Sequence, residues 1–240
     1  IRNEYGETGV EITDFYWDTI VAGTSNFADS QIIARGKSGT TTIYSMALVQ
    51  PSEEFAVKKF SHSSGLNSFN EFMNEIVLLP KLKHPNIIKL IGYCIEGKEK
   101  LLVYELMPPR ISTSLCKDRL KSNPLHQWSV RFKLIIGIAE GVAYLHEYSG
   151  LRVVHGDLKL INILLDKSMM NPKISGFGSA EGLTIGVMSP EYSLKMKSDI
   201  YNFGVIVLAM MSGKMVTTVS DTASLIDNGG VGEEKKMPYS

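Results

Sequence analysis

Apolar positions in the first half of the chain fall into short alternating or continuous runs. These runs predict four strands, at residues 41–48, 53–60, 87–95 and 100–107. Between the second and third runs, residues 67–82 have apolar side chains at helical spacing, and Pro80 is expected to end or bend that helix. The first half of the chain therefore predicts a sheet with one helix.

The second half of the chain has the spacing of helices. Residues 129–148 carry apolar side chains three and four positions apart, which predicts a helix with one buried face. That face is expected to consist of Phe132, Ile135, Ile136, Ala139, Val142 and Leu145. A sheet-rich part followed by a helix-rich part predicts an α+β fold of two lobes, with ligands bound where the lobes meet.

The local composition and hydrophobic pattern divide the chain into four stretches. Residues 1–26 are polar with scattered aromatic side chains. We assign residues 27–107 to the sheet-rich lobe and residues 108–214 to the helical lobe. Residues 215–240 are polar and contain glycine, which predicts a disordered tail.

Composition narrows the function classes. The 240 residues are 44% hydrophobic and 21% charged, as in ordinary soluble globular proteins. Lys plus Arg equals Asp plus Glu at 25 each, so no overall field favours nucleic acid, which we do not expect as a partner. Cys94 and Cys116 lack CxxC spacing and are interpreted as ordinary thiols of a reducing compartment. The longest apolar stretch, residues 200–211, is too short for a membrane span.

The run HGDLKLINILL, residues 155–165, carries the strongest chemical signal. It resembles the catalytic loop of protein kinases, and the match covers Asp157, Lys159 and Asn162. In that pattern the Asp accepts the proton of the substrate hydroxyl and the Asn holds a Mg²⁺ ion. The resemblance therefore implies that Asp157, Lys159 and Asn162 are catalytic, with Asn162 also a metal ligand.

The run KISGFGSAE, residues 173–181, resembles the kinase metal motif with one change. The pattern has Asp-Phe-Gly, whereas this chain has Gly176 before Phe177 and Gly178. Phosphoryl transfer depends on metal neutralisation of phosphate charge, and glycine has no side chain with which to hold a cation. We therefore expect Mg²⁺ binding to be weak or absent.

The remaining kinase positions concern the nucleotide. Lys58 in AVKKF and Glu75 in the helical stretch resemble the strand lysine and its partner glutamate, although two solvated charges would look the same in isolation. RGKSGTTTIY keeps Gly36 and offers Gly39, but Ser38 and Thr41 stand where the family has glycines, so an ordinary turn is the alternative. KLLVYELMPP resembles the strand and hinge that face adenine. The candidate nucleotide-binding residues are Lys58, Glu75, Gly36, Gly39, Ala56, Glu105, Met107 and Leu164, with Tyr104 at the back of the pocket.

Several structural roles follow from the same resemblance. Phe177 is expected to form an apolar column with Leu79, Leu90 and His155, and Asp199 to brace the backbone of the catalytic loop. Gly156 replaces the arginine that pairs with a phosphorylated segment, which argues against activation by phosphorylation there. The helical lobe is shorter than in the family, so apolar surface between residues 203 and 211 is expected to be uncovered.

From Phe15 to Lys214 the chain resembles the domain of plant receptor-like serine/threonine kinases. The motifs include EFMNEIVLLPKLKHPNIIKLIGYC, LLVYELMPP, HGDLKLINILLD and SPEYSLKMKSDIYNFGV. The resemblance implies ATP as cofactor, signalling or defence as the process, and other kinases or receptor complexes at the plasma membrane as partners. It also makes residues 1–26 juxtamembrane-like and places the chain in the cytoplasm, at the inner face of the plasma membrane.

Three hypotheses follow. The first is a pseudokinase that binds ATP weakly and acts as a scaffold or regulator, because the metal-binding acid is missing. The second is a low-activity ATP-dependent Ser/Thr kinase, because Lys58, Asp157 and Lys159 are retained. The third is a fragment without independent function, because the helical lobe is truncated.

Overall fold

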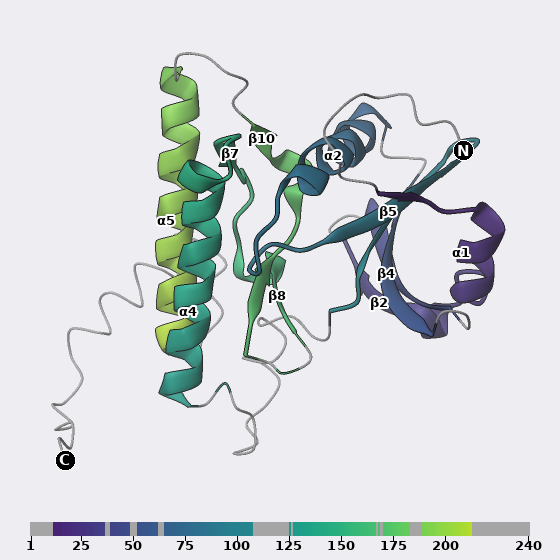
Figure 1. The fold of residues 1–240 in the computed structure, drawn as a ribbon, viewed down its shortest axis with the longest axis horizontal. Helices are drawn as coiled ribbons and strands as arrows, with labels where there is room; N and C mark the ends of the chain where they lie inside the picture. Colours follow the sequence, from purple (N-terminus) through teal and green to yellow (C-terminus); the bar gives the residue numbers. More distant parts are fainter. Residues whose placement is uncertain are drawn as a thin grey trace, which may run out of the picture.

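The sheet-rich part and the helix-rich part that the sequence predicts lie side by side as two lobes (Figure 1). The α+β two-lobed expectation is therefore confirmed. The computed structural model describes residues 12–36, 39–48, 52–61, 65–107, 125, 127–166, 168, 170–182 and 189–212. The predicted tail at 215–240 lies outside these residues. In the described part of the chain, no helix is both long enough and apolar enough to cross a membrane.

The first lobe is built on a sheet with the strand order β1-β5-β6-β4-β3-β2. The strands are β1 (Thr13–Asp14), β2 (Ile32–Arg35), β3 (Thr41–Leu48), β4 (Glu53–Phe60), β5 (Leu90–Glu96) and β6 (Glu99–Glu105). All neighbours are antiparallel except β1 and β5. The predicted strands at 41–48 and 53–60 coincide with β3 and β4, whereas β5 starts three residues later than predicted.

Helix α2 (Gly65–Leu78) packs against one face of this sheet. Phe72 on α2 is fully buried and meets Phe60 of β4 edge to face, with ring centroids 5.7 Å apart. The α-helix ends at Leu78 and a 3₁₀ turn containing Pro80 follows, because proline cannot donate the next helical hydrogen bond. The predicted effect of Pro80 is confirmed.

Residues 12–26 form structure that the polar sequence does not predict. Strand β1 pairs with β5, and helix α1 (Trp17–Gly23) covers the sheet face opposite α2. Ile20 is fully buried there beside Met46, and Trp17 contacts the Phe27 ring at 5.4 Å. A few apolar side chains among polar neighbours are enough to anchor this strap, defined here as residues 12–24, because the sheet supplies the other half of the core.

The second lobe consists mainly of α4 (Trp128–Ala143) and α5 (Pro190–Ser212), which lie side by side in Figure 1. A π-helical turn at Tyr144–Tyr148 extends α4. Two short ribbons complete the described part of the lobe: β8 (Ile163–Leu165) with β9 (Pro172–Ile174), and β7 (Val153–Val154) with β10 (Glu181–Gly182). Trp128 at the start of α4 is half exposed and contacts Phe132.

The predicted buried face of α4 is partly wrong. Phe132 and Ile136 are 51% and 44% exposed, whereas Leu134, Ile138 and three of the predicted residues, Ile135, Val142 and Leu145, are buried. The helix turns its glycines toward β9, since a Cβ at Gly137 would lie 2.7 Å from Pro172 and one at Gly141 would lie 2.8 Å from Ile174. A search for large apolar residues overlooks such a contact face.

The uncovered apolar surface predicted between residues 203 and 211 is also only partly present. Ile206, Ala209 and Met210 are buried in the main core cluster. Met211 is exposed, and so are Leu194, Ile200 and Tyr201 earlier on α5. α5 packs against α4, but Phe203, Val205, Val207 and Leu208 are only partly buried.

Candidate functional site

A cavity of about 450 Å³ lies between the lobes and is lined by residues from β2, β3, β4, α2, β6 and the segment from Asp157 to Gly176. The structure brings most of the candidate residues to its wall: Gly36, Ala56, Lys58, Glu75, Glu105, Met107, Asp157, Lys159, Asn162 and Leu164. Gly39 is not among the lining residues. Its backbone has a positive φ and a Cβ there would meet open space, so it serves the turn between β2 and β3.

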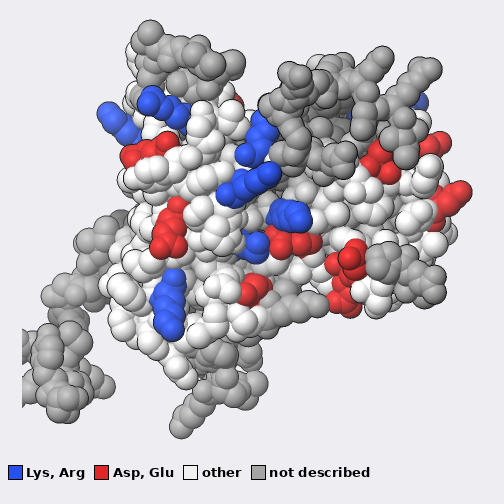
Figure 2. All heavy atoms as spheres, in the orientation of Figure 1, with Lys and Arg blue, Asp and Glu red and all other residues white. Residues whose placement is uncertain are grey.

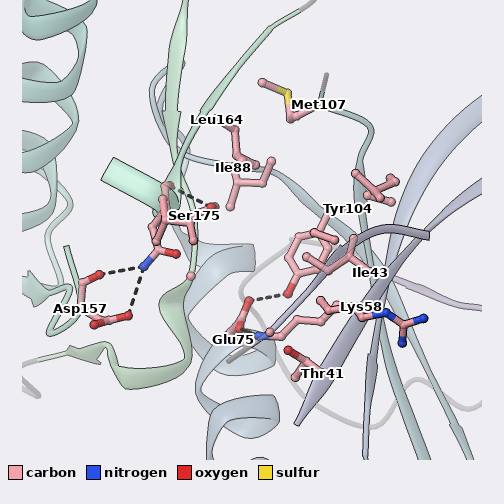
Figure 3. A pocket seen from close by; sticks show the side chains of 18 of the residues that line it. Thr41, Ile43, Lys58, Glu75, Ile88, Tyr104, Met107, Asp157, Leu164 and Ser175 are labelled. Carbon is pink, nitrogen blue, oxygen red and sulfur yellow. Dashed lines mark hydrogen bonds and ion pairs between the residues drawn. The ribbon is translucent and has the colours of Figure 1, made fainter. Parts of the chain in front are cut away.

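Lys58 and Glu75 form an ion pair inside this cavity. The distance between Lys58 Nζ and Glu75 Oε1 is 2.7 Å, and the Glu75 side chain is almost completely buried. Tyr104 donates its hydroxyl hydrogen to the other oxygen of Glu75, as Figure 3 shows. Burial, with Glu75 close by, raises the pKa of Tyr104 well above its usual value, so the phenol stays a donor. These contacts connect β4, α2 and β6 at the back of the cavity.

An apolar slot occupies the other end of the cavity. Ile88, Met107 and Leu164 lie together there (Figure 3), and Ala56 and Ile43 also line the cavity. The carboxylate of Glu105 faces Lys173 of β9 at 2.9 Å and accepts a hydrogen bond from the Lys89 backbone at 2.8 Å. The Glu105 side chain therefore connects the lobes, while the slot itself suits a flat apolar ligand.

The catalytic-loop residues lie together on the second lobe's side of the cavity. Asn162 donates its amide hydrogens to the Asp157 carbonyl at 2.8 Å and to Asp157 Oδ2 at 3.2 Å. Lys159 forms an ion pair with the other carboxylate oxygen of Asp157. Asn162 and Lys159 are the side chains of this loop that could contact a phosphate or a hydroxyl, and both contact Asp157.

Asp199 braces this loop, as the resemblance implies. Its carboxylate accepts hydrogen bonds from the backbone nitrogens of His155, at 2.7 Å, and Gly156, at 3.1 Å. The His146 ring lies 3.0 Å from the same carboxylate. Asp199 is buried, so its charge is compensated by these three donors rather than by water.

His155 is a packed core residue. Its ring meets Phe177 with centroids 4.8 Å apart, and Leu79, Leu90 and Phe177 belong to the same buried cluster. The Asp157 backbone donates to His155 Nδ1 at 3.2 Å, and His155 Nε2 lies 3.0 Å from the Ser175 carbonyl. These contacts suit the neutral tautomer with its hydrogen on Nε2. Burial accordingly lowers the pKa of His155.

Gly176 lies where a metal-binding carboxylate would enter the cavity. Its backbone is left-handed, with φ +84°, and a Cβ built there would lie 2.8 Å from Asn162 Cγ. The Asn162 amide thus occupies the space next to residue 176. In the described part of the chain, no three acidic, histidine or cysteine side chains gather into a metal-binding cluster. The residues fit an adenine-like ligand in the apolar slot, but they do not fit a tightly held Mg²⁺ ion.

Gly156 allows the backbone of another segment to pack closely against the catalytic loop. It has a positive φ of 74°, and a Cβ there would lie 2.6 Å from the carbonyl oxygen of Ser179. The segment after Phe177 therefore packs directly on the catalytic loop, and β10 continues that contact by pairing with β7.

Sequence reasoning missed several lining residues. Ile43, Ile88, Arg35 and Ser175 all line the cavity. The alternation of strand side chains could have found Ile43, because it pairs with Lys58 across β3 and β4 and so shares its face. Ile88 and Ser175 reach the cavity because of the way their loops fold, and no local sequence pattern indicates that folding.

Basic and acidic side chains are interspersed on the face drawn in Figure 2, including the region where the lobes meet. This agrees with the equal numbers of basic and acidic residues in the sequence.

Comparison with known proteins identifies relatives of this chain. The family model described as protein kinase domain matches residues 27–232. A G-type lectin S-receptor-like serine/threonine-protein kinase of Arabidopsis thaliana is 41% identical, over 87% of this chain and 26% of the relative. Cysteine-rich receptor-like protein kinase 34 of the same plant is 42% identical, over 89% of this chain and 35% of the relative. The chain thus spans about a quarter to a third of the length of these relatives.

Proposed function

Because this chain belongs to the protein kinase domain family, with plant receptor-like kinases among its relatives, we propose that it is a pseudokinase. In this proposal the cavity between the lobes binds adenine nucleotides weakly and transfers little phosphate. The observation that carries the proposal is Gly176, which gives the cavity no carboxylate where a cation would bind.

The size of the loss follows from the chemistry of phosphoryl transfer. Mg²⁺ supplies neutralisation of phosphate charge, and this contribution amounts to several kcal/mol. A loss of about 4 kcal/mol lowers the rate about a thousandfold. Asn162 is the remaining candidate ligand, and its amide nitrogen is directed to Asp157. A kinase that is already slow would transfer phosphate at a negligible rate after such a loss.

The retained residues support a binding role. The Lys58–Glu75 pair, held by Tyr104, keeps α2 against the sheet, and the apolar slot beside Met107 accommodates a purine. Asp157 and Lys159 neutralise each other. The ion pair between Glu105 and Lys173 joins the two lobes, and it stabilises one relation between them, which is what a scaffold needs.

The test is transfer of radiolabelled phosphate from ATP to the protein itself and to a generic basic protein, with Mg²⁺ and with Mn²⁺. We expect no signal above that of the Asp157→Asn variant. Turnover that Asp157→Asn abolishes would defeat the proposal.

A second candidate function is a low-activity Ser/Thr kinase. It is favoured by the 2.7 Å Lys58–Glu75 pair and by Asp157, Lys159 and Asn162 on one wall of the cavity. The same transfer experiment separates the candidates, because only this one yields a signal that depends on Asp157.

We also propose that the protein works beside receptor-like kinases at the inner face of the plasma membrane, as a regulator in signalling or defence. The names of the relatives motivate this proposal. Coexpression with a full-length receptor-like kinase should shift the protein from the soluble to the membrane fraction. An unchanged distribution would contradict it.

A further inference from the structure

Helix α5 has almost no charge along its C-terminal half. Between Ser198 and Met211 the one charged residue is Asp199, and its carboxylate is buried against the catalytic loop. The core covers one side of this half, whereas Ile200, Tyr201 and Met211 are exposed. A helix of this composition is normally buried on every side. In the described part of the chain one side of α5 remains uncovered, which indicates a surface for a partner.

The uncovered side of α5 has the spacing of a contact between two helices. Leu194, Tyr201 and Leu208 recur every seven residues, and Ser198 and Val205 lie between them, four residues after Leu194 and Tyr201. Leu194 and Tyr201 are 64% and 56% exposed, and Val205 and Leu208 are half-buried. A stripe with this period packs along a similar stripe of a second helix. These five residues are called the seam below.

Helix α4 widens this surface at the C-terminal end of α5. An exposed stripe on α4 consists of Trp128, Phe132 and Ile136. Arg131 connects the two helices, because its guanidinium donates to the Met210 carbonyl at 2.8 Å and the Met211 carbonyl at 3.1 Å. The same guanidinium lies 5.7 Å from the centre of the Trp128 ring. Figure 1 shows α4 and α5 at the end of the molecule opposite the sheet, where a second protein can reach them.

The size of this surface suits a weak but specific contact. From Leu194 to Met211, α5 is about 27 Å long at about 1.5 Å per residue, and two helices side by side are about 20 Å wide. Two such surfaces bury on the order of 1,000 Å² when they meet, which is the lower limit for a specific contact between proteins. We therefore expect association in the micromolar range.

The seam is complementary to a second copy of itself. It contains no charged residue, so two seams that meet bring no like charges together. A charged partner surface would lose its water there without gaining a counter-charge. A two-fold axis places the same residues of both copies in the contact, so that each copy covers the apolar side chains of the other.

We propose that the protein forms a two-fold symmetric dimer in which the seam of one copy packs against the seam of the other, with the exposed stripe of α4 at the edge of the contact. The dimer goes beyond the pseudokinase proposal and does not depend on it, since no seam residue lines the cavity between the lobes. The dimer holds two cavities in one particle and leaves both open.

Sedimentation velocity of the full chain, from about 1 µM to about 200 µM, tests the dimer, and the dissociation constant should lie in the micromolar range. Because the seam has no charge, the dissociation constant should change by less than about twofold between about 50 mM and about 500 mM salt. A strong dependence on salt would place the contact on a charged surface and overturn the proposal.

Leu194→Lys and Tyr201→Lys test the seam directly. Both side chains are exposed and lysine is a good helix former, so the fold should be retained. Each variant should raise the dissociation constant at least about tenfold, because the two-fold axis doubles the number of lysines in the contact. Leu66→Lys is the matched control, since Leu66 is an exposed leucine on α2 in the other lobe. It should change the dissociation constant by less than about twofold.

A mixture of Tyr201→Lys and Tyr201→Glu tests the two-fold arrangement. Opposite charges then enter one contact, so the mixture should associate more tightly than either variant alone. A mixture no tighter than its components overturns the arrangement, and so does association that continues beyond the dimer.

A wild-type chain that stays monomeric at about 200 µM overturns the proposal, because the surface is then bare, covered by residues 213–240 of the same chain, or reserved for another protein. Equal weakening by Leu66→Lys also overturns it, because the effect would not be specific to the seam. Thermal melting followed by circular dichroism checks that the variants fold. If Tyr201→Lys does not fold, Leu194→Lys decides.

Discussion

Gly176 has no carboxylate, and its backbone conformation disfavours a residue that carries one. Its φ of +84° is unfavourable for residues with a Cβ, and the Asn162 side chain already occupies the adjacent space. Gly176→Asp should therefore lower the free energy of unfolding by about 1–3 kcal/mol and restore no phosphate transfer. Urea denaturation and the radiolabel assay measure the two effects.

Gly176→Ala serves as the control, because it introduces the backbone strain and the contact with Asn162 without a carboxylate. Similar losses of stability in both variants would show that the backbone conformation and the contact with Asn162, not the carboxylate, lower the free energy of unfolding. Transfer by Gly176→Asp that disappears in a double variant with Asp157→Asn would show that Asn162 gives way and that the rest of the site is competent.

At the level of elements, the strap of residues 12–24 depends on one small residue of the neighbouring strand. Phe15 donates its backbone hydrogen to the Tyr93 carbonyl at 2.8 Å, and a Cβ at Gly92 would collide with the Thr13 carbonyl and lie 2.7 Å from the Phe15 ring. Gly92→Ala should detach β1 from β5 and abolish hydrogen-exchange protection of the Phe15 amide. The other sheet amides should keep theirs.

Gly204→Ala provides the comparison, since a Cβ at that position on α5 meets nothing within 4 Å. It should stabilise the protein by about 0.5–1 kcal/mol, because alanine is the better helix former. Retained protection of Phe15 in Gly92→Ala would mean that the sheet yields without releasing the strap.

The elements differ in how well the sequence predicts them. β3, β4 and α2 were predictable because each has a local period and a clear stop, such as Pro80. The strap was not, because its anchors are few and its partner strand is 79 residues away, with Thr13 paired to Gly92. In the site, the motifs pointed to Lys58, Glu75 and Asp157, and all three line the cavity. The crowding at Thr41, Gly156 and Gly176 depends on distances between segments, which no local pattern contains.

For the whole molecule, His155 makes stability depend on pH. Burial lowers its pKa in the folded protein below the ordinary value of 6.5. As the pH falls through 6.5, the unfolded chain takes up a proton that the folded protein does not, so the free energy of unfolding decreases. The slope attributable to this residue is at most about 1.4 kcal/mol per pH unit.

Urea denaturation of the wild type and of His155→Phe at several pH values between about 5 and 8 isolates this contribution, since the ordinary value lies in that interval. His155→Phe keeps a ring against Phe177 and should show a shallower loss of stability below pH 6.5. The pKa of His84 is also lowered by burial, but His84 is present in both proteins and cancels. Parallel curves would exclude His155 as the titrating group.

Each lobe also contains one of the chain's two tryptophans, Trp17 on α1 and Trp128 at the start of α4. Trp17 lies against the sheet beside the Phe27 ring, whereas Trp128 is half exposed beside Phe132 and the Arg131 guanidinium. The two indoles therefore have different surroundings and belong to different halves of the fold. When one tryptophan is replaced, the intrinsic fluorescence reports only on the lobe that holds the other. The unfolding of each lobe can then be followed without attaching a dye.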